Sequence, residues 1–368
     1  MELALGPRVA KSPFFDATVA AGVTHLSIYN QTYMPVLYGD PEAEYRRLTE
    51  GVSVWDVACQ RQVELHGPDA AALAQMLCAR DLRKQVIGQG KYAPVCDHQG
   101  RILNDPVVLK VEEDRWWLSI ADGDVLWWAR AIAAERRLDV SVSEPDVSPL
   151  AIQGPMAEDV VATMFGDWIR DLKYFWFGEA EIDGIPVLVS RSGWSKQGGY
   201  ELYLRDGSRG VELWNLVLDA GAPYGIGPGA PNYVERIESN LLSFRADTVD
   251  ECTPLELGLG RFMSLDSDVD FIGKDALVAL RDSGTLPRRL VGVWLDEQPT
   301  GPNAHPWPAS VDGVAVGSVR AVCHSYKFDR PIGLALIDTP FDAAGTVLDV
   351  DSETGPRTAR VSELPFTA

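Results

Sequence analysis

The chain has 368 residues, more than a single hydrophobic core usually supports, so we expect two or three domains. It carries 33 Lys and Arg against 53 Asp and Glu, and the resulting net charge of -20 disfavours binding to nucleic acids and to anionic membrane surfaces. The rest of the composition is typical of a globular enzyme.

The cysteine pattern predicts a reducing compartment. The five cysteines are scattered and form no C-x-x-C pair, which is typical of free thiols in a cytoplasm. The amino terminus has no long apolar run after its basic residues, and no apolar stretch of about 18 residues occurs in the chain. We therefore expect a cytoplasmic protein that is neither exported nor inserted into a membrane.

The first third of the chain predicts an α+β unit. Residues 11–38 are rich in aromatics without periodicity, and a short charged helix is expected at 41–50. Strand material at 52–65 is followed by a helix from Gly67 to about Cys78. A three-stranded meander from Lys91, a helix and a final strand complete an order close to a ferredoxin-like element.

A similar order recurs further on, around a hairpin at 185–204. Its ends alternate as strands do, but Gly193 and the pair Gly198-Gly199 bracket a polar loop with one tryptophan and one lysine. Loop composition alone leaves two interpretations open, a functional loop and a decorated surface turn.

The remaining segments predict a third, all-β part. A helix is expected over 232–244, whereas the Gly/Pro-rich string at 225–230 has no preceding strand and is interpreted as a turn. From Leu290 onward, short apolar runs alternate with turns, so we place a domain boundary near 281–287.

The inventory of chemical groups excludes some mechanisms. The histidines are too dispersed to predict a metal site, and no histidine base is indicated for Ser195. What remains is acidic. Asp105 interrupts an apolar strand and Glu201 opens a buried one, while Arg236 lies on a charged helix. Propensity alone slightly favours a bulge or edge residue at Asp105 over a functional one, and the helix on its own is interpreted as a solvated face.

Several ordered blocks carry a resemblance. They are AIQGP (151–155), SRSGWSKQGGYELYL (190–204), ERIESNLLSF (235–244), TPLELGLGRF (253–262) and FIGKDAL (271–277). Together they resemble the folate-dependent aminomethyltransferase family, that of the glycine-cleavage T-protein. The blocks KSPFFDATV (11–19), VWDVACQRQV (54–63) and ILNDPV (102–107) are most similar to its dimethylsulfoniopropionate-demethylating branch.

The resemblance implies an α+β fold. Two interleaved ferredoxin-like domains would surround a central channel that holds folate, and a C-terminal β-barrel-like domain would follow. The implied ranges are 1–50 with 145–280 for the first folate-binding domain, 51–144 for the second, and 281–368 for the β-rich domain.

The resemblance also implies a reaction. A methyl group would move from dimethylsulfoniopropionate, or a similar sulfonium donor, to N5 of tetrahydrofolate. The partners would be these two small molecules, and a second copy of the chain in a homodimer. Neither nucleic acid nor membrane is implied, and a lipoyl-protein partner is less expected than for the T-protein.

Site residues follow from the same resemblance. Asp105 and Tyr203 would be catalytic, and no metal would take part. The folate-binding residues would be Tyr92, Asp105, Trp194, Ser195, Glu201, Tyr203 and Arg236. The aromatic residues around the donor would be Phe15, Tyr33, Trp194 and Tyr203.

The chain departs from the demethylase pattern near the donor. Gln31, Thr32 and Tyr33 stand where that branch has a different run, and Gly90-Lys91 precede Tyr92. Two alternatives therefore stay open. The same chemistry would act on another methylated amine, betaine or ether, or the chain would bind folate without catalysis.

Overall fold

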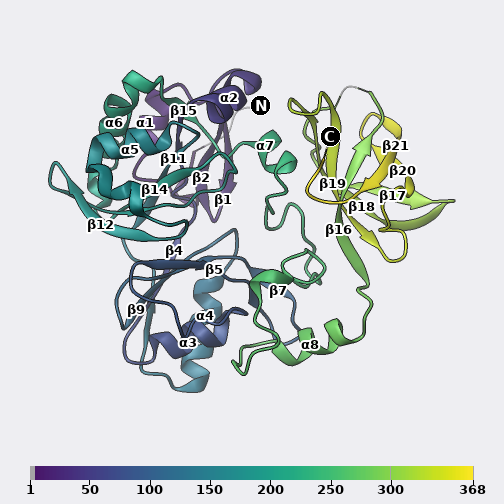
Figure 1. Ribbon diagram of the computed structural model, residues 1–368, viewed down its shortest axis with the longest axis horizontal. Helices are drawn as coiled ribbons and strands as arrows, with labels where there is room; N and C mark the ends of the chain where they lie inside the picture. Colours follow the sequence, from purple (N-terminus) through teal and green to yellow (C-terminus); the bar gives the residue numbers. More distant parts are fainter. Residues whose placement is uncertain (1–4, 299, 368) are drawn as a thin grey trace. The chain divides into compact units, whose positions relative to one another are not determined.

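The computed structural model describes residues 5–298 and 300–367 and divides into two units (Figure 1). The first contains the residues up to Ala74, Leu82–Tyr92 and Pro106–Asn232, and the second contains Gln75–Asp81, Ala93–Asp105 and the residues from Tyr233 onward. The three-range domain division stays a prediction. Within the described ranges, no helix is both long and apolar enough to cross a bilayer.

A six-stranded sheet organises the first unit. Its order is β12-β13-β14-β11-β3-β15, antiparallel except where β15 runs parallel to β3. The strands are β3 (Ser53–Asp56), β11 (Ser148–Gln153), β12 (Phe177–Ile182), β13 (Ile185–Ser190), β14 (Gly199–Leu204) and β15 (Gly227–Gly229). The predicted hairpin at 185–204 is therefore confirmed, as β13 and β14.

Helices cover one face of this sheet (Figure 1). They are α1 (Phe15–Ala20), α5 (Ala157–Phe165) and α6 (Gly210–Gly221). Alternate strand residues such as Val189 and Leu202 pack in one core with Trp214 of α6, because successive side chains of a strand point to opposite faces. The intervening strand residues therefore point to the face of the six-stranded sheet that these helices do not cover.

A five-stranded sheet, in the order β10-β4-β9-β8-β5, faces that second side. Its strands are β4 (Gln62–His66), β5 (Gln89–Tyr92), β8 (Val107–Lys110), β9 (Arg115–Ser119) and β10 (Ser141–Ser143). Trp117 of β9 packs with Leu188 and Tyr203 of the six-stranded sheet in one buried cluster. The other elements here are α2 (Pro41–Glu50), α3 (Ala70–Leu77, which begins in this unit), α4 (Val125–Arg136) and the hairpin of β1 (His25–Tyr29) and β2 (Thr32–Leu37).

The second unit contains a closed six-stranded barrel, which confirms the all-β part predicted after residue 290. Its strands are β16 (Arg288–Leu295), β17 (Trp307–Val311), β18 (Val314–Ser325), β19 (Arg330–Asp338), β20 (Val347–Ser352) and β21 (Gly355–Ser362). The remaining elements are β6 (Val95–Cys96), β7 (Ile102–Asn104), α7 (Tyr233–Glu238) and α8 (Lys274–Asp282). The α+β class with a C-terminal barrel is thus confirmed.

Two local predictions were wrong. Residues 227–229 form strand β15 instead of a turn, because β3 supplies a pairing edge that composition does not reveal. The helix predicted over 232–244 ends at Glu238, and Asn240 adopts a positive φ of 52° that a helix does not accommodate.

Buried charge explains this early helix end. Arg236 is 1% exposed, and its Nη1 donates to both carboxylate oxygens of Asp247 at 2.8 and 2.7 Å. Asp247 also accepts from the backbone N–H of Ser243 at 2.7 Å. The segment after α7 therefore folds back so that this carboxylate reaches the guanidinium, and a continued helix would not bring the two groups together.

Replacing Asp247 by Ala should destabilise the second unit by about 3–5 kcal/mol, because a buried guanidinium would lose its partner. Denaturant unfolding measures the loss. The matched control is Asp266→Ala, whose exposed carboxylate pairs with Arg281 at 2.6 Å and should contribute less than about 1 kcal/mol. Equal effects of the two substitutions would contradict the structural role assigned to the Arg236–Asp247 pair.

Candidate functional site

Strand β14 carries Glu201 and Tyr203 on the sheet face opposite the helices. The residues between and beside them, Tyr200, Leu202 and Leu204, enter the helix-covered core, so the period of two directs Glu201 and Tyr203 the other way. Glu201 is 5% exposed and Tyr203 is 1% exposed. A carboxylate is therefore buried inside the first unit.

The strand register surrounds Glu201 with small side chains. Ala151 of β11 and Ser190 of β13 are its partners in the two neighbouring strands, and Trp55 is the next residue across from Ala151. Directly opposite residues on paired strands are close neighbours on one face. The Glu201 carboxylate thus lies beside two short side chains, and the indole of Trp55 lies two strands away.

Hydrogen bonds reach only one oxygen of this carboxylate. Ser192 Oγ donates to Glu201 Oε2 at 2.5 Å, and the Tyr203 hydroxyl donates to the same atom at 3.4 Å. No donor from the described residues reaches Oε1. Burial raises the pKa of Glu201, and the two hydroxyl donors oppose that rise. Oε1 is therefore available to accept from a ligand.

The loop before Glu201 is fixed by Gln153. This buried side chain donates from Nε2 to the carbonyl oxygens of Ser192 at 3.1 Å and Tyr200 at 3.4 Å, and its Oε1 accepts from Ser195 Oγ at 2.8 Å. A Cβ at Gly193 or Gly199 would come within 2.1 and 2.4 Å of Nε2, so both positions require glycine. The predicted functional loop is thus a rigid one.

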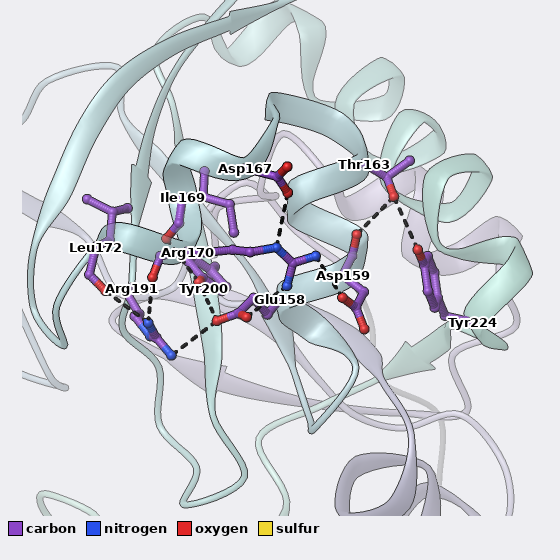
Figure 2. A network of polar contacts seen from close by, with 10 residues as sticks. All are labelled: Glu158, Asp159, Thr163, Asp167, Ile169, Arg170, Leu172, Arg191, Tyr200 and Tyr224. Carbon is purple, nitrogen blue, oxygen red and sulfur yellow. Dashed lines mark hydrogen bonds and ion pairs between the residues drawn. The ribbon is translucent and has the colours of Figure 1, made fainter.

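A polar network holds both ends of the same loop (Figure 2). Arg191 Nη2 lies 3.2 Å from Glu158 Oε2, and Nη1 donates to the carbonyl oxygen of Leu172 at 3.0 Å. At the other end, the Tyr200 hydroxyl donates to the carbonyl oxygen of Ile169 at 3.1 Å. Helix α5 and the turn after it therefore anchor both the end of β13, where the loop begins, and β14, which carries Glu201.

The aromatic residues predicted around the donor lie partly together. Phe15 and Tyr33 are buried with ring centroids 5.7 Å apart, and Lys11 Nζ lies 4.6 Å from the centroid of Phe15. The Tyr33 hydroxyl accepts from the backbone N–H of Gly6 at 2.9 Å. Trp194 is half-buried in the loop before β14. Phe15 therefore already presents its ring to a cation.

The other predicted residues are distributed over both units. Tyr92 ends β5 in the first unit and is half-buried. Asp105 follows β7 in the second unit, where it is half-buried and its N–H donates to Asn104 Oδ1 at 3.0 Å. Arg236 belongs to the second unit as well. Their roles stay predictions.

Some polar residues at the site were missed from sequence. Ser192, Ser190 and Gln153 support Glu201 or its loop, and strand alternation could have indicated Ser190, which lies in register with Glu201. The sequence indicates Asp56 only as part of a strand. In the structure it is 2% exposed and accepts from Ser12 Oγ at 2.5 Å, and burial raises its pKa to about 6. Within the described ranges, no cluster of three or more His, Cys, Asp or Glu side chains is placed to hold a metal.

Two family matches cover most of the chain. Residues 14–267 match the GCVT N-terminal domain, and residues 288–367 match the glycine cleavage T-protein C-terminal barrel domain. The chain therefore belongs to the glycine-cleavage T-protein family.

Individual relatives agree with this family. The chain is 41% identical over 356 residues to the dimethylsulfoniopropionate demethylase DmdA of Ruegeria pomeroyi, covering 97% of each chain. It is 31% identical to an aminomethyltransferase of Symbiobacterium thermophilum over 90% of this chain and 91% of that one. The solved aminomethyltransferase T of Bartonella henselae has the same fold, with a TM-score of 0.85 and 20% identity over 98% of both chains.

The ionised carboxylate of Glu201 should lower the free energy of unfolding at neutral pH. Because burial raises its pKa, the folded state holds the proton more tightly than the unfolded state does. Its stabilising contribution is complete below its ordinary pKa of about 4.3 and is lost as the pH rises through the raised value. Glu201→Gln should therefore melt a few degrees (roughly 2–4 °C) above the wild type at pH 8, with a smaller difference at pH 5.

Thermal melts between pH 5 and pH 8 measure this difference. The control is Glu179→Gln, which changes an exposed carboxylate of the same sheet and should not raise the melting temperature at pH 8. A wild type that melts above Glu201→Gln at pH 8 would mean that the hydroxyl donors outweigh the cost of burial.

Proposed function

We propose that this chain moves a methyl group from dimethylsulfoniopropionate, or a similar sulfonium compound, to N5 of tetrahydrofolate. The observation that carries the proposal is the buried carboxylate of Glu201, whose Oε1 has no donor from the described residues. A buried carboxylate is costly unless hydrogen bonds compensate it, and a ligand that offers N–H groups supplies such bonds.

The residues present suit a pterin. Its 2-amino group and N3–H are two adjacent donors, and a carboxylate accepts from such a pair. The strand partners of Glu201, Ala151 and Ser190, have small side chains, which supports the proposal that a flat ring fits beside Glu201. In the proposed site, Glu201 holds the pterin edge together with Tyr92, Trp194, Ser195 and Tyr203, whereas the buried pair that Arg236 forms with Asp247 argues against the same role for Arg236.

Orientation is the main contribution of the chain. When bound, tetrahydrofolate supplies a neutral N5 that accepts the methyl group, so neither an enzyme nucleophile nor a metal is required. Holding two reactants in attack geometry can supply on the order of 7–11 kcal/mol. The loop fixed by Gln153 and the Arg191 network provides such rigidity around Glu201. Asp105 is proposed to receive the proton that leaves N5, directly or through water.

Aromatic faces would hold the donor cation. Phe15, Tyr33, Trp194 and Tyr203 are the proposed residues, and a cation over such a face gains about 0.5–2 kcal/mol.

The identity of the donor rests on the relative from Ruegeria pomeroyi, whose name states its substrate. We further propose a cytoplasmic homodimer. Its location is supported by the five cysteines, all of which are buried free thiols.

The purified chain, mixed with dimethylsulfoniopropionate and tetrahydrofolate, should form 5-methyltetrahydrofolate and methylmercaptopropionate in equal amounts. Chromatography with mass detection measures both products. Turnover only with another methylated amine, betaine or ether would overturn the donor assignment. Folate binding without turnover on any donor would identify a non-catalytic folate-binding protein.

Two substitutions should separate binding from turnover. Glu201→Gln should weaken tetrahydrofolate binding on the order of tenfold or more, because an amide cannot accept two N–H donors as a carboxylate does. Asp105→Asn should mainly lower kcat. Calorimetry and steady-state kinetics measure the two effects, with Glu179→Gln as the control. Unchanged folate affinity in Glu201→Gln would remove the assigned role of this carboxylate.

A further inference from the structure

The longest uncharged run of this acidic chain contains an exposed hairpin. Residues 17–39 include no Asp, Glu, Lys or Arg, although the chain has a net charge of -20. The β1–β2 hairpin lies within this run, and its residues Ile28 and Val36 are 51% and 42% exposed. Two copies of so acidic a chain repel one another, so a contact between them is least opposed where neither copy presents a charge.

The turn of the hairpin fixes the direction of its backbone groups. Asn30 and Gln31 form a two-residue loop with positive φ values of 49° and 59°, as a type I′ turn has. Tyr29 and Thr32 flank this loop and are partners. They therefore form the hydrogen-bonded pair that closes the hairpin, and the pairs after it alternate in direction.

The next pair turns its backbone groups outward. Ile28 is the partner of Tyr33, and the Tyr33 N–H donates beyond the outer edge of β2, to the carbonyl oxygen of Ala10 at 3.0 Å. Ile28 therefore points its own N–H and C=O out of the opposite edge of the hairpin. Leu26 does the same two residues earlier, opposite Pro35, which has no N–H.

This outer edge of β1 is open. Among the described residues, no group hydrogen-bonds to the outward N–H and C=O of Leu26 and Ile28, and no bridge lies along them. Such a row of backbone groups is a template for pairing with another strand. Proteins usually prevent this pairing with charged side chains or with a covering segment.

Two other sheet edges of the first unit have that protection. Strand β12 carries the exposed side chains of Glu179 and Glu181. Strand β5 is covered, because the Gly90 N–H donates to the carbonyl oxygen of Phe175 at 2.6 Å.

Arginine side chains occupy the remaining two edges. In β10, the carbonyl oxygen of Val142 accepts from Arg130 Nε at 2.9 Å, and in β15, that of Pro228 accepts from Arg47 Nη1 at 2.7 Å. Within the part of the first unit that the structure describes, the outer edge of β1 has neither a charge nor a cover.

Two copies of β1 fit one another in antiparallel orientation. With a two-fold axis at Ser27, Leu26 of each copy lies opposite Ile28 of the other. Both residues then exchange their outward N–H and C=O groups in hydrogen-bonded pairs, and the two Ser27 side chains meet at the axis. The product is a four-stranded sheet, whereas a two-stranded hairpin alone is only marginally stable.

We propose that the outer edge of β1 is the surface on which a second copy of the chain pairs, in antiparallel register about Ser27. The existence of a homodimer rests on the proposed function, and the strand that forms it is the new inference. A single pair of short strands buries less area than a typical stable interface, so we expect a dimer that forms at micromolar concentrations.

Ser27→Lys and Ser27→Asp test the register, because Ser27 is exposed in one copy and meets its equivalent at the axis. Either substitution places like charges directly opposite one another, which should raise the dissociation constant of the dimer on the order of tenfold or more. The two substitutions change the net charge in opposite directions, so loss of the dimer in both does not come from net charge. An equimolar mixture of the two variants should dimerise again, because Lys then faces Asp.

Sedimentation velocity over a series of protein concentrations measures the association. Ser141→Lys and Ser141→Asp are the matched controls, because they place the same charges on an exposed serine of β10, another edge strand. They should leave the dissociation constant unchanged.

The outcomes separate this inference from the proposed function. A wild type that stays monomeric at every concentration would overturn the inference and the proposed homodimer, while leaving the proposed methyl transfer untouched. Dimers that persist in Ser27→Lys and Ser27→Asp would overturn the assigned surface alone. Two monomeric variants whose mixture does not dimerise would overturn the register about Ser27. A dimer that is lost in both variants and restored in the mixture supports the inference, whatever donor the chain accepts.

Discussion

The burial of one carboxylate is the constraint on which this structure depends. Removing an ionised group from water is costly unless hydrogen bonds replace the lost solvation. The chain meets part of that requirement for Glu201 with the hydroxyl groups of Ser192 and Tyr203, which donate to one of its two oxygens. In the proposed function, the other oxygen accepts from a ligand with paired N–H groups.

Much of this arrangement follows from local sequence. Alternation in β13 and β14 is enough to place Glu201 and Tyr203 on one face, and the cap at Asp40 with Pro41 is enough to begin α2. The alternating runs after residue 290 likewise indicate a sheet, although its closure into a barrel comes from pairing between β16 and β21.

Other parts depend on partners distant in sequence. Residues 227–229 have low intrinsic strand preference, and only the edge of β3 makes them a strand. Helix α7 ends early because Arg236 needs Asp247, eleven residues later, and no periodicity shows this.

Strand β14 is hydrogen-bonded on both sides, by β13 and β11. A register shift of one residue would direct the Glu201 side chain into the helix-covered core. An insertion or deletion within this strand would therefore disrupt the fold. The hairpin of β1 and β2, which carries Tyr33, is a two-stranded sheet, and within the part of the chain that the structure describes only a single bridge, from Ala10 to Thr32, pairs with its outer edge. Proteins with this fold can therefore change the β1–β2 hairpin, and with it the methyl donor, while strand β14 and its proposed folate-binding residue Glu201 stay the same.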